Sequence, residues 1–183
     1  MPDSVVPLKY CHGTLSLVAK QIKASYDLRH VAKGQGATGL EGLTIWTIGY
    51  SGRSKRAFLA LLKDYGIEIL VDVRHFPTSK NPDFKREAME TWLPENGIRY
   101  VWLGDLLGGF RRGGYERYMG TPAFREGIEK LIELAKQGRT CIMCMERNPK
   151  YCHRRHIAAY LESMGVRIVH ILGFRSADIR SFR

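Results

Sequence analysis

The chain has 183 residues, of which 44% are hydrophobic and 26% are charged. This balance is typical of a folded globular protein and excludes an intrinsically disordered or membrane-embedded chain. The net charge of +11 favours an anionic partner, either a phosphorylated small molecule or nucleic acid, although a basic surface can also serve solubility alone.

The sequence shows no signal for export or membrane insertion. Its N-terminal segment lacks the charged start, apolar stretch and small-residue cleavage site of a secretory signal, and no apolar run reaches the roughly 20 residues of a membrane helix. The four cysteines, at positions 11, 141, 144 and 152, do not have the spacing of a disulfide framework. We therefore expect reduced thiols, a cytoplasmic location and no membrane partner.

The first part of the chain differs from the rest. Residues 1–42 have no sustained periodicity, and the stretch 33–39 has the composition of a flexible linker. From residue 43 onward, short apolar runs alternate with amphipathic stretches. We expect an N-terminal extension over residues 1–42 and a single α/β domain over residues 43–183 that folds without it. Nothing in the sequence indicates the oligomeric state.

The alternation from residue 43 predicts successive strand–helix units around a parallel sheet. Five apolar runs have the length of buried strands, at residues 43–49, 67–74, 98–103, 139–145 and 166–172. Capping residues, prolines and glycines predict four helices, at residues 54–66, 83–95, 121–138 and 152–164. The expected fold is a three-layer, Rossmann-like α/β domain with a mainly parallel sheet of about five strands.

Open parallel sheets bind ligands beyond the carboxyl ends of their strands. After the first strand, a turn with Ser51 and Arg53 leads into a helix N-terminus, where these residues would hold an anion; a plain tight turn is the alternative. At the end of the second strand, Asp72 and Arg74 share a face because side chains alternate. Either Arg74 contacts an anion, or the two residues form a structural ion pair.

The segment 104–120 combines glycines with three aromatic residues and three arginines. Aromatic rings stack on bases and arginines neutralise phosphates, so this composition suits single-stranded or flipped-out nucleic acid. A mobile lid over a smaller substrate would have the same composition. The residues concerned are Phe110, Tyr115, Tyr118, Arg111, Arg112 and Arg117.

The segment 141–156 contains most of the residues that could do chemistry. Cys141 and Cys144 are three residues apart on a strand, so they point to opposite faces and should not share a metal. Cys144 and Glu146 face the same way. Cys152 is expected in the first turn of a helix, beside arginines and His153, where a thiol pKa falls and a reactive thiolate forms.

These positions give the candidate catalytic residues Glu146, Cys152 and His153. Cys152 would be the nucleophile, His153 would take its proton, and Glu146 would act as a general acid or base. Arg154 would hold an anion, or else pair with Glu146 as a structural salt bridge. Cys144 either supports the site or is a small buried core residue.

Four segments, in this order, resemble motifs of the domain of unknown function 488 family (DUF 488). They are residues 47–54 (Thr-Ile-Gly-Tyr-Ser-Gly-Arg-Ser), 71–77 (Val-Asp-Val-Arg-His-Phe-Pro), 103–109 (Leu-Gly-Asp-Leu-Leu-Gly-Gly), and Cys-Met-Glu at 144–146 followed by Cys-His-Arg at 152–154. The resemblance covers about residues 43–173 and implies a compact α/β domain of bacterial and archaeal type whose activity is not established. The motif residues carried over are Ser51, Arg53, Asp72, Arg74, Pro77, Cys144, Glu146, Cys152, His153 and Arg154.

Three functional hypotheses remain open. The first is an enzyme or sensor for a phosphorylated or nucleotide-like compound, which needs no metal or other cofactor. The second is a nucleic-acid-binding protein without catalysis, using segment 104–120 and a basic ridge. The third is a metal-dependent enzyme, since cysteine, histidine and glutamate are competent zinc ligands. The basic ridge would be Arg147, Lys150, Arg154 and Arg155, and the metal ligands Cys144, Glu146, Cys152 and His153.

Overall fold

The computed structural model describes residues 40–175. A sheet of five strands in the order β3-β2-β4-β1-β5 forms its centre, and every neighbouring pair is parallel. Each predicted strand is present, although slightly shorter than predicted. The strands are β1 (Thr44–Gly49), β2 (Ile69–Asp72), β3 (Arg99–Trp102), β4 (Thr140–Cys144) and β5 (Arg167–Ile171). The extension predicted over residues 1–42 lies almost entirely outside the described residues and stays a prediction.

All four predicted helices are present. The second and fourth begin later than predicted, because the Asn-Pro pairs at Asn81 and Asn148 turn the chain into the 3-10 segments η2 (Pro82–Phe84) and η3 (Pro149–Tyr151) first. In each pair the asparagine side chain accepts a hydrogen bond from a backbone N–H two residues on. The helices are α2 (Lys55–Asp64), α3 (Arg86–Glu95), α6 (Pro122–Gln137) and α7 (Arg154–Ser163).

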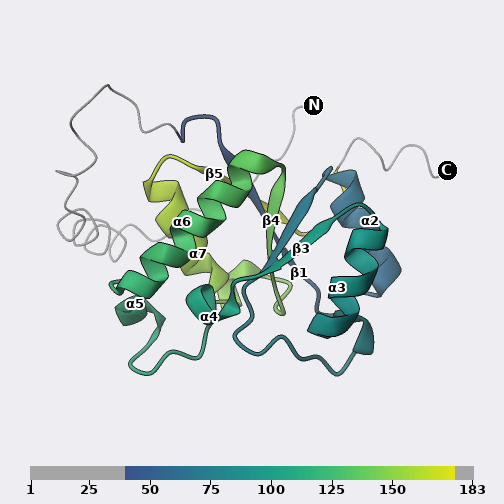
Figure 1. Ribbon diagram of the computed structural model, residues 1–183, viewed down its shortest axis with the longest axis horizontal. Coiled ribbons are helices and arrows are strands. Elements are labelled where there is room, and N and C mark those ends of the chain that lie inside the picture. Colours follow the sequence, from purple (N-terminus) through teal and green to yellow (C-terminus); the bar gives the residue numbers. More distant parts are fainter. Residues whose placement is uncertain (1–39, 176–183) are drawn as a thin grey trace, which may run out of the picture. The chain divides into compact units, whose positions relative to one another are not determined.

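Two further helices, α4 (Gly104–Leu107) and α5 (Tyr115–Tyr118), lie in the segment that the sequence predicted as a loop. Both are single turns, shorter than the window over which helical periodicity can be recognised. They precede α6 and form one end of the helical layer to which α6 and α7 belong (Figure 1).

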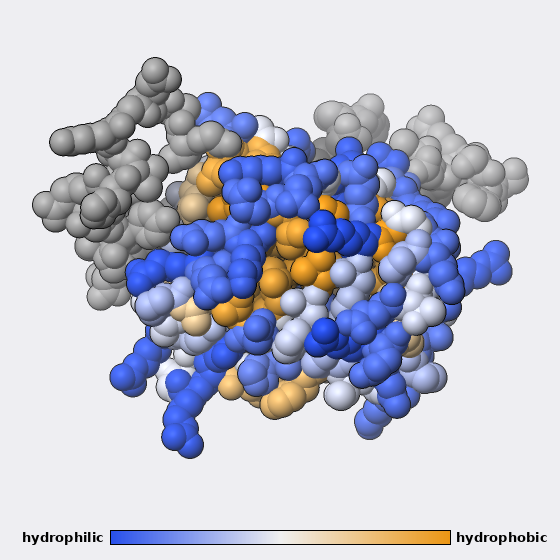
Figure 2. Space-filling model, viewed as in Figure 1, coloured by the Kyte–Doolittle hydropathy of each residue, from blue (hydrophilic) through white to orange (hydrophobic). Residues whose placement is uncertain are grey.

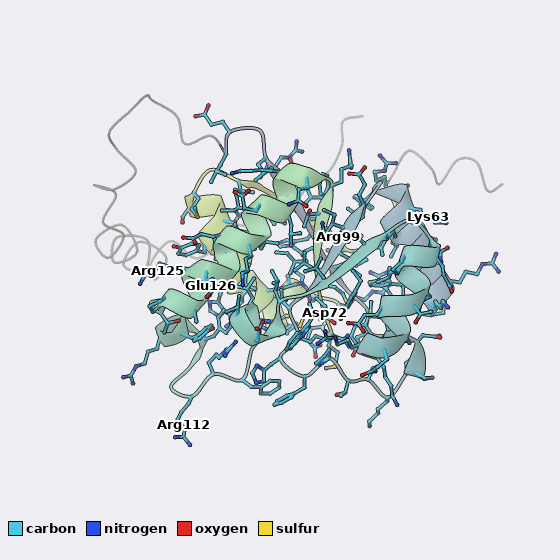
Figure 3. The ribbon with its side chains drawn as sticks, viewed as in Figure 1. Lys63, Asp72, Arg99, Arg112, Arg125 and Glu126 are labelled. Atoms are coloured by element: carbon cyan, nitrogen blue, oxygen red, sulfur yellow. The ribbon has the colours of Figure 1, made fainter. Side chains whose placement is uncertain are left out.

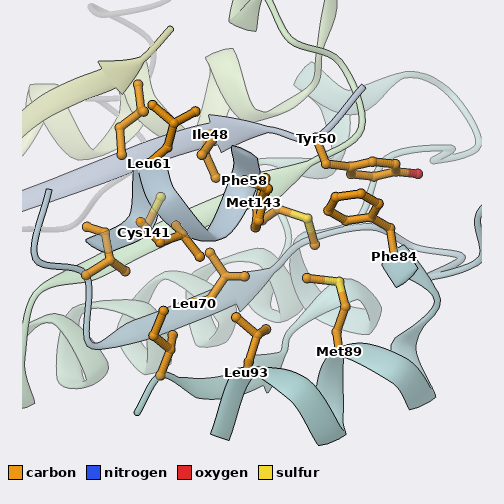
Figure 4. Packing of buried hydrophobic residues seen from close by; sticks show 14 of the residues in the cluster. Ile48, Tyr50, Phe58, Leu61, Leu70, Phe84, Met89, Leu93, Cys141 and Met143 are labelled. Carbon is orange, nitrogen blue, oxygen red and sulfur yellow. The ribbon is translucent and has the colours of Figure 1, made fainter. Parts of the chain in front are cut away.

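The helices cover both faces of the sheet (Figure 1). Helices α2 and α3 pack on one face, where the stacked rings of Tyr50 and Phe84 have centroids 4.5 Å apart (Figure 4). Cys141 and Met143 of β4 point into this layer, so Cys144 points to the opposite face, on which α6 and α7 pack. The expected three-layer α/β fold is confirmed.

The topology opens a gap beside β4. The chain leaves β1 and β2 through α2 and α3 on one face, but it leaves β4 through α7 on the other. Since β4 lies between β1 and β2, the loops that follow these three neighbouring strands diverge. This is a topological switch point, where open α/β sheets bind their ligands.

The edge of the sheet at β3 is shielded by cationic side chains. The Arg86 guanidinium lies over the Trp102 ring, 4.6 Å from its centroid, and Arg99 donates to the Gln137 side chain of α6. On this side of the molecule, hydrophilic residues surround apolar ones gathered between α6 and α3 (Figure 2). Charge beside an edge strand discourages pairing with another chain. No helix within residues 40–175 has the length and hydrophobicity needed to cross a bilayer.

Candidate active site

A pocket of about 330 Å³ opens at the carboxyl ends of the strands. Its walls come from the segments that follow β1, β2, β3 and β4, as the switch point predicts. Figure 3 shows Asp72 at this end of the sheet and Arg112 projecting from the segment between α4 and α5 beyond it. The lining residues are Tyr50, Arg74, His75, Phe76, Thr78, Gly109, Phe110, Cys144, Met145, Glu146, Tyr151, Cys152 and His153.

Close contact between two loops forms the pocket wall at β1 and β4. The backbone N–H groups of Tyr50 and Ser51 donate to the carbonyl oxygens of Cys144 and Met145, at 3.3 and 2.9 Å. A Cβ atom at Gly49 would lie 2.0 Å from the carbonyl oxygen of Glu146, so only glycine allows this approach. The glycine at the end of β1 therefore sets the position of Cys144 and of the half-buried Glu146 beside it.

Two cysteines and one histidine meet in the pocket. The Nδ1 atom of His153 lies 3.9 Å from the sulfur of Cys144 and 3.9 Å from that of Cys152. The Nε2 atom of the same ring lies 3.0 Å from the carbonyl oxygen of Val73. A carbonyl can only accept, so Nε2 is protonated, and Nδ1 is the ring atom that can exchange a proton with either sulfur.

This arrangement divides the two thiols into a donor and an acceptor. A hydrogen bond from the Cys144 thiol lowers the pKa of Cys152, and His153 and Arg154 act in the same direction, against the effect of burial. The same hydrogen bond, together with burial, raises the pKa of Cys144. These directions favour Cys152 as the thiolate and Cys144 as the thiol of the pair, an assignment that stays a prediction. Cys152 does not lie in the first turn of α7 as predicted but directly precedes its N-cap, His153.

Arg154 lies beneath this site and not on the surface. It is 1% exposed, and its Nη2 donates to the carbonyl oxygen of Arg147 at 3.0 Å. Within the described part of the chain, its Nε and Nη1 have no hydrogen-bond partner. The predicted pairing of Arg154 with Glu146 is therefore wrong, and so is its place in an exposed basic ridge. Its buried charge instead lowers the pKa of Cys152.

Asp72 and Arg74 form a buried structural pair on the α3 side of the sheet, so this interpretation of their spacing is confirmed. The carboxylate accepts from the backbone N–H, Nε and Nη2 of Arg74 and from the Tyr100 hydroxyl, at 2.6–3.1 Å. The remaining nitrogen of Arg74 donates to the carbonyl oxygens of Thr78 and Phe84. Although burial alone would lower the pKa of Arg74, its bonds to Asp72 raise it. The side-chain nitrogens of Arg74, which were expected to bind an anion, are therefore already hydrogen-bonded within the protein.

Ser51 and Arg53 line an adjoining groove of about 630 Å³, not the cysteine pocket. Arg53 donates through Nε to the Gly49 carbonyl and through Nη2 to the Leu172 carbonyl, which ties the turn after β1 to the end of β5. Burial and nearby Arg147 lower the pKa of Arg53. Ser51 is exposed in the groove. Anion binding by Ser51 and Arg53 stays a prediction.

Two of the three aromatic residues in segment 104–120 are half-buried, and their hydroxyl groups donate to backbone carbonyls. The Tyr115 hydroxyl donates to the Leu107 carbonyl at 2.7 Å, and the Tyr115 ring lies 5.2 Å from that of His153. Tyr118 donates to the Leu106 carbonyl at 2.8 Å. Burial raises the pKa of Tyr115. Tyr115 was expected as a stacking ring and not as a contact of His153; its i,i+3 spacing from Tyr118 was the available signal.

The cysteine–histidine cluster also has the composition of a metal site. Cys144, Cys152 and His153 offer three ligand atoms within 4.8 Å of one another, and in residues 40–175 this group does not include Glu146. Tetrahedral zinc sets sulfur and nitrogen ligands about 3.6 Å apart, close to the 3.9 Å found for each sulfur. The bond from His153 to a backbone carbonyl is the usual support of a ligating imidazole. Cys141 lies outside the cluster, as predicted, and Cys11 lies outside the described residues.

The chain matches a known protein family. Residues 54–161 match the family described as Domain of unknown function DUF488. No curated protein and no solved structure matches the chain. The match spans more than half of the 183 residues and includes Cys144, Cys152 and His153. The chain belongs to the DUF488 family.

Proposed function

We propose that this protein is an enzyme that uses Cys152 as a thiolate nucleophile on an anionic, phosphorylated or nucleotide-like substrate. One observation carries the proposal: Nδ1 of His153 faces the Cys152 sulfur while Val73 holds the other ring nitrogen in its protonated form. A nucleophile beside a base that a third group orients is the general pattern of covalent catalysis. The sulfur also lines an open pocket.

The reaction we propose begins from the Cys152 thiolate, whose proton has passed to Nδ1 of His153 to form an imidazolium. The thiolate then attacks an electrophilic carbon or phosphorus of the substrate, and the bond to the leaving group breaks as the bond to sulfur forms. The imidazolium returns its proton to the leaving group, so charge and protons balance. The sulfur-to-nitrogen distance of 3.9 Å is long for a hydrogen bond, but such contacts often tighten only when substrate binds.

Two neighbouring groups support the thiolate. The Cys144 thiol hydrogen-bonds to the Cys152 sulfur, and Arg154 supplies a buried positive charge that the described residues leave without a carboxylate partner. An uncompensated buried cation is costly, so an anionic sulfur near it stabilises both groups. Glu146 lines the pocket, where we propose it as a second acid or base.

Peptide-mapped alkylation tests the proposal. A short pulse of iodoacetamide at neutral pH should modify Cys152 before Cys144, and Cys141 in the core should remain unmodified as an internal control. His153→Ala should slow modification of Cys152, because the ring no longer takes its proton. Cys152 reacting no faster than Cys144 would remove it as the nucleophile.

A metal-dependent enzyme is the second candidate, favoured by the three ligand atoms within 4.8 Å. Elemental analysis of the purified protein separates the two. Stoichiometric zinc that is lost in Cys144→Ser and in His153→Ala would assign the cluster to a metal and replace the thiolate proposal. Zinc that is retained in both variants would not come from this cluster.

A further inference from the structure

The Cys152 pocket is the middle one of three adjoining hollows. Tyr50, Thr78 and Met145 line both this pocket and the groove of about 630 Å³ that contains Ser51 and Arg53. On the other side, Tyr151, Cys152 and His153 line both the pocket and a third hollow of about 400 Å³. The shared walls place the three hollows in a row across the carboxyl end of the sheet, and this row is called the track; Cys152 lines its central pocket and the third hollow.

Exposed apolar side chains gather at the mouth of the central pocket. Phe76, Phe110 and Tyr151 are 63%, 90% and 72% exposed, and Met145 is also exposed. All four line the same pocket. The rings of Phe76 and Phe110 have centroids 6.2 Å apart. Large apolar side chains concentrated at one opening mark a binding site, whereas single exposed ones are ordinary.

The backbone holds Phe110 in this exposed position. Its φ angle is +58°, the only positive value outside glycine in the described part of the chain. A phenylalanine in the left-handed region is under strain, and such strain persists where the surrounding structure imposes it, often at ligand sites. A Cβ atom at the preceding Gly109 would lie 3.0 Å from Nδ1 of His153, so the turn that carries the exposed aromatic passes close to the cysteine–histidine cluster.

Cationic side chains lie on both sides of the aromatic mouth. Arg53 and Lys80 line the hollow on one side, and Arg155 lines the hollow on the other. Glu116 and Glu146 are the acidic residues along the track, each in a different hollow. A track with a ring-lined centre and a cationic side chain on each side matches a base flanked by phosphates, although Glu116 offsets Arg155 in the third hollow. The net charge of +11 attracts such a ligand over a longer range.

We propose that the track binds single-stranded nucleic acid, with one base held among Phe76, Phe110 and Tyr151 above Cys152 and the neighbouring phosphates at the cationic ends. The central pocket, with a volume of about 330 Å³, suits one unpaired base rather than the base pairs of a duplex. The proposal names the substrate class of the enzyme and to that extent rests on the proposed function. Binding itself does not require the thiol.

Fluorescence polarisation with labelled oligonucleotides tests binding directly. We expect a labelled single strand to bind more tightly than a duplex of the same sequence or a mononucleotide, because only the single strand places a base in the pocket and phosphates at both ends. Phe110→Ala should weaken single-strand binding about 5- to 150-fold, the loss expected for one stacked base. Phe174→Ala removes an exposed ring outside the track and is the matched control, with unchanged affinity.

A second pair of variants tests the charged ends. Lys80→Gln should weaken binding and reduce its salt dependence, whereas Lys63→Gln on α2, outside the three hollows, should do neither. Equal effects of the two variants would indicate attraction to overall charge and overturn the track. Equal affinity for single strand and duplex, or tighter binding of the mononucleotide, would overturn nucleic acid as the ligand.

One further variant separates this inference from the proposed function. Cys152→Ser should lose all chemistry at that position but keep the preference for the single strand over the duplex, because the rings and cationic side chains of the track remain. Loss of binding in Phe110→Ala with Cys152 still reactive would support the track alone. Single-strand binding unaffected by both Phe110→Ala and Tyr151→Ala would refute it, whatever the reactivity of the thiol.

Discussion

Asp72→Asn should strongly destabilise the fold, because it leaves Arg74 as an uncompensated buried charge. The native carboxylate is fully buried and accepts from three donors of Arg74 and from the Tyr100 hydroxyl. An asparagine keeps one acceptor oxygen but removes the negative charge. Breaking one partner of a buried pair costs about 3–5 kcal/mol. With a urea slope of about 2 kcal/mol per molar, the unfolding midpoint should fall by about 1.5–2.5 M.

Urea unfolding of matched variants checks this magnitude. Glu90→Gln breaks the exposed Arg86–Glu90 pair on α3, for which a loss of no more than about 1 kcal/mol is expected. Tyr100→Phe removes one hydrogen bond to the carboxylate and should fall between the two, at about 1.5–3 kcal/mol. If Asp72→Asn lost no more stability than Glu90→Gln, the buried pair would not stabilise the end of β2 as the geometry indicates.

Two further variants act on the cysteine–histidine cluster. Gly109→Ala would place a Cβ atom 3.0 Å from Nδ1 of His153, so the ring must shift and alkylation of Cys152 should slow. Gly120→Ala is the control: its Cβ atom would have its nearest contact at 3.5 Å, and the alkylation rate should not change. Arg154→Met removes a buried charge that lowers the pKa of Cys152, so the pH midpoint of alkylation should rise, and an unchanged midpoint would exclude Arg154 as a support of the thiolate.

The positions of the strands could be predicted because a parallel strand buried on both faces must be apolar along its length. Because parallel strands end at the same edge of a sheet, Cys144 and Cys152 were also expected at that edge. What the sequence did not show is the third partner, the Val73 carbonyl, which fixes the His153 ring from a segment 80 residues away. Every residue has a backbone carbonyl, so the sequence does not indicate which one contacts His153.

Two other differences between prediction and structure, the start of α7 and the burial of Arg154, have causes that are visible in the sequence. Asn-Pro at residues 148–149 forms a 3-10 segment before α7, so the helix begins after Cys152 rather than at it. Arg154 precedes Ile157, Ala158 and Leu161 at helical spacing, which places it on the buried face of α7. Its charge suggested the surface, but its position in the helix determined its burial.

The ultraviolet absorbance of thiolate, followed as a function of pH, tests the proposed nucleophile most directly because it needs no reagent to enter the pocket. The difference between the native protein and Cys152→Ser reports the titration of Cys152 within its pair. We expect this difference to appear well below the free thiol pKa of about 8.5, to move to higher pH in His153→Ala, and to return to about 8.5 when the chain is unfolded in urea. A folded-state midpoint at or above about 8.5 would contradict the assignment of Cys152 as the thiolate.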